Sequence, residues 1–408
     1  MSVFGVVGVF AGFGVLAYMI YKGIDFGKAV LIAAAVLLLT SEPSLAGVRW
    51  VWDISKEYET LRLIAIITQV GFLGYLYKDS DQVMRMIKEL RSILPDRRMV
   101  VASIPAIFGL MPMPGGALVS APMIDGEADK LNLDGVEKTY LNWWWRHIWF
   151  TVYPLSMGLI LASTLSGVDI YKIALFNLPI FAVQIIVGVV WGLKKIEVHS
   201  SSHRERTFMN PLLLAYELLP IIIALLLNVV LGIPFYITLS LAILIILLQN
   251  QQKYSLGEMP SLFKDGFSVD LLLAAYGIML FKGIIERGGA VTPLIAVMEG
   301  YVPLLALVLT ASYIIGMLFG HLPGAVGVGF PVLLPLLPVV NLQTVGMVFL
   351  FIFLGYFSSP IHLCIILTIE YFGIDLKSFY RRMIVSFIVL VSAVVVWMLV
   401  SGTFFIFI

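Results

Sequence analysis

The sequence predicts an all-α polytopic membrane protein with two inverted-topology repeats, each of about five transmembrane helices plus one re-entrant helical hairpin. Three observations predict this fold. Hydrophobic residues make up 60% of the 408 positions and charged residues only 12%, a composition typical of membrane proteins. Apolar runs long enough for spanning helices recur along the whole chain. Two of these runs are interrupted by proline and glycine at corresponding places in the two halves.

The two interruptions share one pattern. Met111 to Pro122 reads MPMPGGALVSAP, and Gly320 to Pro338 reads GHLPGAVGVGFPVLLPLLP, so that each holds a Pro-Gly pair followed by another proline eight residues later. Inside a bilayer an unsatisfied backbone group costs several kcal/mol, so a broken helix persists only where it packs in protein or lines a watery cavity. Paired breaks in corresponding halves indicate a transporter's binding site.

The remaining apolar runs complete the two halves. We expect spans at 3–21, 27–41, 61–77, 143–165 and 171–193, and again at 211–231, 233–249, 269–285, 345–368 and 382–407. A proline follows each hairpin, in Tyr153-Pro154 and in Ser359-Pro360, and a Gly-x-Asp tripeptide follows each proline thirteen residues later. One alignment of the two halves therefore covers both the hairpins and the helices after them.

Five spans per half is an odd number, so the halves must have opposite orientations. With both broken segments re-entrant and the N-terminus outside, most Lys and Arg fall in predicted inner loops, as the positive-inside rule requires. The C-terminus is then also outside. The predicted domains are a first repeat at 1–193 with its hairpin at 99–124, a basic cytoplasmic linker at 194–210, and a second repeat at 211–408 with its hairpin at 302–338.

A helical hairpin broken near mid-membrane exposes N–H groups that favour an anion and carbonyls that favour a cation. The candidate substrate- and ion-binding residues lie at the two tips and at the proline-broken helices after them: Pro114, Gly115, Gly116, Ser120, Tyr153, Pro154, Ser156, His321, Pro323, Gly324, Gly327, Ser358, Ser359, Pro360 and His362. Merely kinked structural helices are the alternative. The serines could equally bond back to their own helix carbonyls.

Ionisable residues in apolar runs are functional hypotheses because their burial is costly. His321 and His362 could carry a proton near neutral pH, or could be hydrogen-bonded packing residues. Glu217 is a further candidate, with a structural ion pair as the alternative. We expect Arg146 and His147, which follow three tryptophans, to be interfacial. The three tryptophans and Trp149 look like an aromatic belt at the membrane interface, formed by Trp143, Trp144, Trp145 and Trp149.

With two re-entrant Pro-Gly hairpins and inverted halves of five spans, the chain resembles the ion transporter superfamily. That group includes divalent anion:sodium symporters, citrate and gluconate permeases, arsenite pumps and some sodium/proton antiporters. GLMPMPGGALVSAP and LNWWWRHIWFTVYPLSMGL look closest to an uncharacterised prokaryotic branch of it, known only as a domain of unknown function. The resemblance covers the whole chain.

The resemblance implies a scaffold domain that dimerises and a transport domain that moves like an elevator. It implies ligand contacts at positions matched here by Gly115, Gly116, Gly324, Gly327 and Ser358 to Pro360. The dicarboxylate symporters carry Ser-Asn-Thr at their hairpin tips, whereas these tips read Pro-Gly-Gly-Ala-Leu and Pro-Gly-Ala-Val-Gly. These tips therefore lack the residues that bind carboxylate and sodium in the dicarboxylate symporters, which keeps a proton as the alternative coupling ion.

Nothing in the sequence matches a P-loop, HExxH, GxSxG or CxxC motif, so we expect no enzyme and no cofactor beyond a coupling Na⁺ or H⁺. We expect a secondary transporter for a small organic anion, homodimeric, in the plasma membrane of a prokaryote, with no nucleic-acid partner. The alternatives are a cation/proton antiporter or metalloid-oxyanion exporter, and, from other classes, a channel or an intramembrane enzyme.

Overall fold

The computed structural model describes residues 3–94, 96–111, 116–194, 196, 211–254, 257, 259–289 and 303–407. Within these ranges every regular element is a helix, and there is no strand. The first half contains α1 (Val3–Tyr21), α2 (Phe26–Ser41), α3 (Leu45–Lys56), α4 (Tyr58–Asp79), α5 (Gln82–Ile93), α6 (Arg97–Leu110), α7 (Gly116–Asp129), α8 (Gly135–Arg146), the 3-10 helix η1 (Ile148–Thr151), α9 (Met157–Ser166), α10 (Ile170–Phe176), α11 (Leu178–Val187) and the π-helical η2 (Gly188–Leu193). The second half contains α12 (Pro211–Leu231), α13 (Phe235–Gln249), α14 (Met259–Gly266), α15 (Val269–Gly288), α17 (Leu304–Phe319), α18 (Leu322–Leu333), the 3-10 helix η3 (Leu334–Leu336), α19 (Leu342–Ser358), α20 (Leu363–Phe372), α21 (Leu376–Val400) and α22 (Thr403–Ile406).

The long apolar helices confirm the predicted fold class at the level of an all-helical chain that is compatible with a polytopic membrane protein. In the described ranges, four stretches are long and apolar enough to cross a bilayer: Tyr58–Asp79, Leu212–Leu231, Leu342–Phe372 and Leu376–Val400. The number rises to six if two bent pairs of helices each count as one span. Shorter apolar helices of 10–17 residues lie at the predicted spans 3–21, 27–41, 171–193 and 233–249. The predicted span 143–165 is instead divided among α8, η1 and α9. The predicted arrangement of five spans and one hairpin per half stays a prediction.

Glycine and proline end the helices where the sequence indicates. Gly320 ends α17 with a φ of +55°, a left-handed conformation that a residue with a Cβ adopts at a cost. A Cβ at this position would also lie 2.7 Å from the carbonyl oxygen of Ile361. Pro323 then occupies the first turn of α18, where its missing N–H is not needed. In the same way α19 ends at Ser358, just before Pro360.

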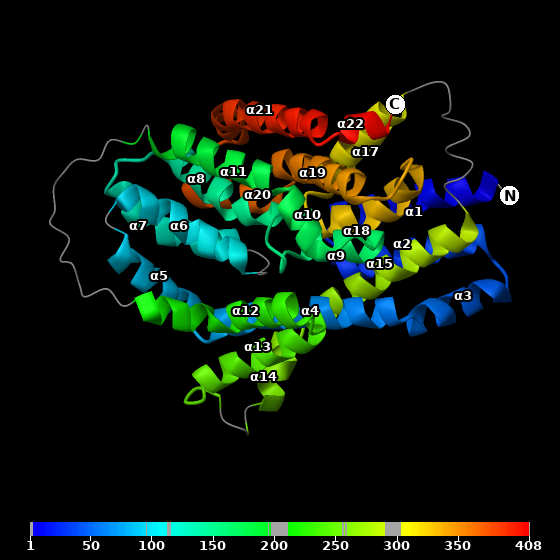
Figure 1. The fold of residues 1–408 in the computed structure, drawn as a ribbon, viewed down its shortest axis with the longest axis horizontal. Helices are drawn as coiled ribbons and strands as arrows, with labels where there is room; N and C mark the ends of the chain where they lie inside the picture. The colour runs from blue at the N-terminus through cyan, green and yellow to red at the C-terminus, as the bar shows by residue number, and fades with distance from the viewer. Residues whose placement is uncertain are drawn as a thin grey trace.

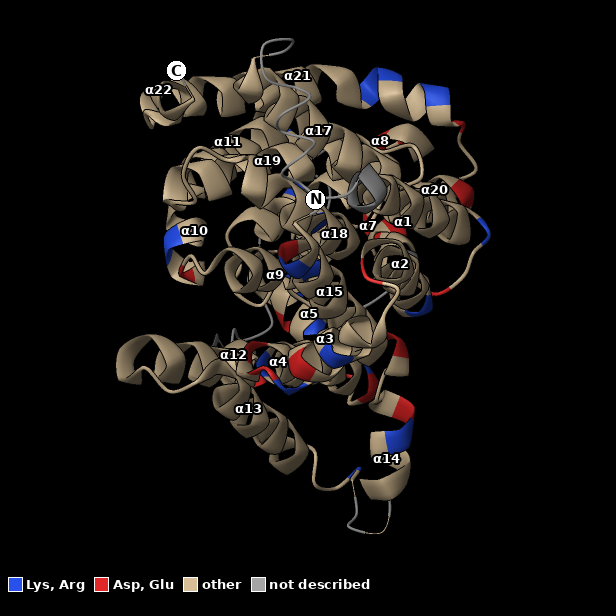
Figure 2. Cartoon of the chain, turned by 90° about the vertical axis from the view of Figure 1, so that its right-hand side faces the viewer, with Lys and Arg blue, Asp and Glu red and all other residues tan. Residues whose placement is uncertain are grey.

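The helices form extended layers (Figure 1). In that view α3, α4 and α12 run along one side with α13 and α14 beyond them, while α21 and α22 lie along the opposite side. Charged residues gather at a few places, and α11, α13, α17 and α19 carry none (Figure 2). The exposed apolar side chains of α11, α13 and α17 fit a protein whose outer faces contact lipid.

Helix contacts cross between the two halves at the centre. The second arm of each hairpin packs on a broken helix of the other half, α7 on α20 and α18 on α9. The first arms pack within their own halves, α6 on α8 and α17 on α19. Outside this centre, α2 packs on α15 and α4 on α13. The crossing brings the break after α8 and the break after α19 against each other.

One expectation about the membrane interface is wrong. Trp143 and Trp144 are fully buried, and the Trp143 ring stacks on Phe357 with ring centroids 4.0 Å apart, so these residues belong to the core and form no belt.

Candidate functional site

The structure places the start of α7 against a buried arginine. Of the first predicted tip, Pro114 and Gly115 lie outside the described residues, and Gly116 is the first residue of α7. A Cβ built on Gly116 would lie 2.4 Å and 2.6 Å from the two terminal nitrogens of Arg146, so the guanidinium sits directly on the backbone of Gly116. Arg146 is only 4% exposed and ends α8. A permanently charged group therefore lies at a helix N-terminus in the interior, and the prediction that Arg146 is interfacial is wrong.

The next residue, His147, is fully buried and joins the two breaks. Its Nδ1 lies 2.6 Å from the carbonyl oxygen of Trp143. Because a carbonyl only accepts, Nδ1 carries the proton and Nε2 has a free lone pair. The Tyr356 hydroxyl, 3.1 Å away on α19, donates to that Nε2. His147 was also expected at the interface, and this expectation is likewise wrong.

His362 lies on the other side of the junction. It is the N-cap residue of α20 and is buried. Its Nδ1 lies 3.2 Å from the carbonyl oxygen of Tyr356, while its Nε2 is buried and has no hydrogen-bond partner among the residues that the structure describes. The rings of His147 and His362 meet edge to face with centroids 4.7 Å apart. Arg146 and His321 are near enough to act electrostatically on His362.

The serines of the second break donate hydrogen bonds to main-chain carbonyls. The hydroxyl of Ser358 donates to the carbonyl oxygen of Leu354 on its own helix. The hydroxyl of Ser359 donates across to the carbonyl oxygen of Met317, 2.6 Å away on α17. Pro360 itself is exposed. Ser358 thus matches the alternative in which a serine bonds back to its own helix, whereas Ser359 ties the break to α17.

The second hairpin tip is closed by His321. Its Nδ1 accepts a hydrogen bond from the N–H of Gly324 at 3.3 Å, which caps α18. The ring also packs edge to face on Phe26, with centroids 5.7 Å apart, and part of it remains solvent-accessible. The predicted residues Pro323 and Gly324 thus lie at the helix start. Gly327 lies one turn further on, where a Cβ would meet the Ile278 side chain at 2.3 Å, so its small size serves close packing.

The remaining predicted residues surround the first break. Ser120 is buried in α7, and its hydroxyl donates to Asn142 Oδ1 at 2.7 Å. The amide of Asn142 donates in turn to the Thr368 hydroxyl at 3.1 Å, which links α7, α8 and α20. Tyr153 is buried after η1, Pro154 is half-buried, and Ser156 is the N-cap residue of α9 without a side-chain cap.

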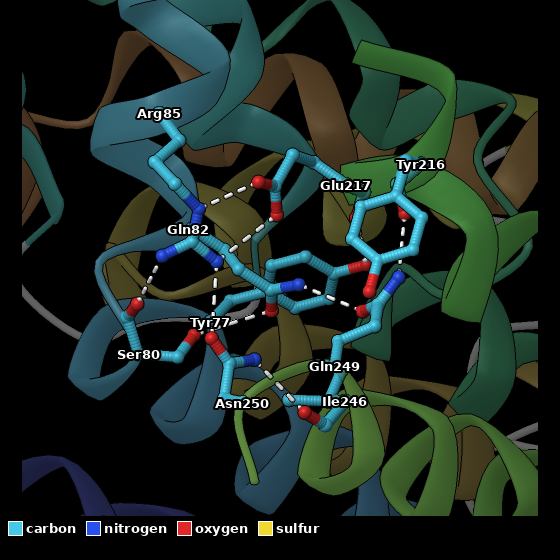
Figure 3. A network of polar contacts seen from close by, with 9 residues as sticks. All are labelled: Tyr77, Ser80, Gln82, Arg85, Tyr216, Glu217, Ile246, Gln249 and Asn250. Atoms are coloured by element: carbon cyan, nitrogen blue, oxygen red, sulfur yellow. Dashed lines mark hydrogen bonds and ion pairs between the residues drawn. The ribbon is translucent and has the colours of Figure 1, made fainter. Parts of the chain in front are cut away.

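Glu217 is a structural ion-pair residue. Its carboxylate accepts two hydrogen bonds from Arg85, at 2.5 Å and 3.1 Å, and Asn250 also accepts from this guanidinium (Figure 3). The Tyr77 hydroxyl donates to the Glu217 carbonyl, so α12 is tied to α4 and α5. This network lies outside the junction of the two breaks and resolves the alternatives for Glu217 in favour of the ion pair.

The structure thus brings Gly116, His321, Gly324 and His362 to the centre. Sequence reasoning missed three further residues there: Arg146, His147 and Tyr356. A signal existed for the first two, because an Arg-His pair inside a long apolar run is as costly as the other buried groups. The three preceding tryptophans favoured the interface interpretation instead.

Fold and site together define the class of this molecule: an apolar all-helical protein, consistent with a membrane-embedded one, whose helix breaks enclose buried basic residues. The chain belongs to the family described as "Protein of unknown function (DUF401)", which matches residues 6–402. No curated protein matches the chain.

Proposed function

We propose that the protein is a secondary active transporter that binds a small organic anion where the two helix breaks meet. The observation that carries the proposal is the buried Arg146 guanidinium on Gly116, at the start of α7. A guanidinium presents its N–H donors in a planar fork that fits a carboxylate or another oxyanion. The N-terminus of α7 contributes partial positive charge at the same place. Two independent features therefore favour an anion at one point inside an apolar protein.

The surrounding histidines reinforce this preference. His147 and His362 contact each other, and Arg146 acts electrostatically on both of them. A proton taken up by either ring would add positive charge beside an anionic substrate, which couples proton binding to substrate binding. We therefore propose H⁺ as the coupling ion. Na⁺ is the alternative, and the binding experiment distinguishes the two ions.

The contact pattern supports the inverted repeat and the link to the ion transporter superfamily as parts of this proposal. Contacts occur in matched pairs: α6 on α8 with α17 on α19, α7 on α20 with α18 on α9, and α2 on α15 with α13 on α4. A two-fold relation between the halves generates such pairs. In this arrangement α6 to α11 and α17 to α22 would form the moving body, and the other helices a scaffold that dimerises and guides an elevator movement.

Location and topology follow from the same proposal. We place the protein in the plasma membrane of a prokaryote with both termini outside. Fusions of a reporter that is active only in the cytoplasm to either end test the orientation. Silent fusions at both ends are expected, and an active fusion at either end contradicts it.

A cation/proton antiporter draws less support from the charges. Such a protein uses carboxylates in the membrane, but the buried Glu217 is paired with Arg85 and the buried Glu127 lies 3.4 Å from Lys130. A metalloid oxyanion would use the same guanidinium and helix terminus as a carboxylate. Oxyanions therefore belong in the same binding experiment.

The binding experiment is a thermal-shift screen of the purified protein against small carboxylates, sugar acids and oxyanions, at pH 5.5 and 7.5, with and without sodium. A ligand at 100 times its Kd stabilises a protein by about 2.7 kcal/mol. We expect one class of anion to stabilise the wild type more strongly at the lower pH, and Arg146→Gln to lose the effect. Stabilisation that depends on sodium instead would assign Na⁺. An unchanged response of a folded Arg146→Gln protein would overturn the proposed site.

A further inference from the structure

Three donor groups of the kind that bind soft metal ions meet at the junction of the helix breaks. His147, His362 and Cys364 each offer one ligand atom, and these three atoms lie within 4.8 Å of one another. A metal with bonds of roughly 2.0–2.3 Å to nitrogen and sulfur holds three ligands about 3.5–4 Å apart. Closing the observed cluster onto an ion therefore needs movements of about 1 Å or less.

Both imidazoles are already held in the form that a metal requires. Each directs its Nδ1 proton to a main-chain carbonyl, that of Trp143 for His147 and that of Tyr356 for His362. Metal-ligating histidines typically donate their second nitrogen in this way, which fixes the tautomer and the ring orientation. The lone pair of His362 Nε2 is buried and meets no hydrogen-bond donor among the described residues.

The other two donor atoms, on His147 and Cys364, can also bind an ion. Among the described residues, His147 Nε2 accepts a hydrogen bond from the hydroxyl of Tyr356, and an ion could replace that bond. Cys364, the single cysteine of the chain, lies two residues after His362 on α20 and is partly exposed. Thiolate and imidazole together favour Cu⁺ or Zn²⁺ over hard cations.

We propose that His147, His362 and Cys364 form a three-coordinate site for Cu⁺. Binding deprotonates the thiol, releasing one proton, and forms one Cu–S and two Cu–N bonds without change of oxidation state. The Cu⁺–thiolate unit is neutral, whereas Zn²⁺ with one thiolate retains a positive charge. Arg146 lies close enough to act on both histidines, so the neutral unit is favoured. The ion would tie the end of α8 to the start of α20.

The test is Cu⁺ binding to the full-length, tag-free protein under reducing conditions, with bicinchoninate as the competing chelator. We expect one Cu⁺ per chain, and at least about tenfold weaker binding for His362→Gln, His147→Gln and Cys364→Ser. Tyr356→Phe is the diagnostic variant. Because it removes the hydroxyl that occupies His147 Nε2, it should bind Cu⁺ as tightly as the wild type or more tightly.

A control variant and X-ray absorption spectroscopy complete the test. His199→Gln combined with His203→Gln changes histidines in the linker and should leave the affinity unchanged. X-ray absorption at the copper edge of the wild type should show one sulfur and two nitrogen ligands, which requires no variant to fold. Coordination without sulfur, an affinity equal to that of the wild type in the Cys364 and His362 variants, or tighter binding of Zn²⁺ than of Cu⁺ would overturn the proposal. Neither measurement depends on transport, so its failure and that of the proposed function are distinguishable.

Discussion

Replacement of Gly116 by alanine tests how closely Arg146 approaches the start of α7. The added Cβ would lie 2.4, 2.6 and 2.8 Å from three guanidinium atoms, whereas ordinary contact begins at 3.4 Å. The guanidinium would have to move away by about 0.6–1.0 Å. Because its atoms form one rigid plane, the group cannot yield one atom at a time. Overpacking of this kind costs about 1–3 kcal/mol.

Gly126 provides a matched control on the same helix. A Cβ at Gly126 meets nothing within 4 Å, and the residue is exposed. Alanine in an open helical position stabilises by about 0.5–1 kcal/mol relative to glycine. We therefore expect Gly116→Ala to unfold at a lower temperature than the wild type and Gly126→Ala at the same or a higher temperature.

The assay follows thermal unfolding of both variants by tryptophan fluorescence in the same detergent. Gly116→Ala should also weaken the stabilising effect of the anion, since the guanidinium is displaced from the helix N-terminus. Equal unfolding temperatures for the two variants would refute the close approach. A destabilised Gly116→Ala protein that still responds fully to the anion would refute the role of this contact in binding.

Three further predictions follow from polar contacts outside the junction. Glu217→Gln weakens the ion pair that joins α12 to α5 and should lower the free energy of unfolding by about 1–3 kcal/mol without altering the anion response; a lost response in a folded variant would contradict the structural role. Arg382 binds Glu137 through two hydrogen bonds of 2.5 and 2.8 Å, so Arg382→Ala should cost about 2–3 kcal/mol, and a double-mutant cycle with Glu137→Gln should show coupling between them. Hydrogen bonds from Arg98 lower the pKa of Asp96 below its ordinary 3.8. Its contribution to stability is therefore present above that value and lost as the pH falls through the lower folded pKa, so the unfolding temperatures of wild type and Asp96→Asn should converge only in strong acid.

The helices were predictable because apolar run length and Pro-Gly punctuation are local properties. Gly320 ends α17 because glycine readily adopts a left-handed conformation. α19 ends before Pro360 because proline disfavours the helical conformation of the residue before it. Both residues are visible in the sequence. The count of spans was less predictable. Several apolar helices in the described ranges are shorter than a bilayer-crossing helix, and sequence alone does not reveal how each is tilted.

The site was only partly predictable because its partners come from distant parts of the chain. Arg146 and His147 look interfacial beside three tryptophans, but α19 packs over those tryptophans through Phe357, which buries the whole segment. Glu217 acquired its partner Arg85 from 132 residues away. Gly327, a predicted tip residue, packs against Ile278 of α15. Each of these contacts depends on tertiary packing that no local pattern encodes.

Uptake into proteoliposomes tests the central proposal most directly. The protein would be reconstituted, and influx of the anion identified by thermal shift would be measured with and without an imposed proton gradient. The account predicts saturable uptake that the gradient accelerates, that Gly126→Ala retains and that Arg146→Gln abolishes. Uptake no greater than in protein-free liposomes, or equal uptake by wild type and Arg146→Gln, would contradict it.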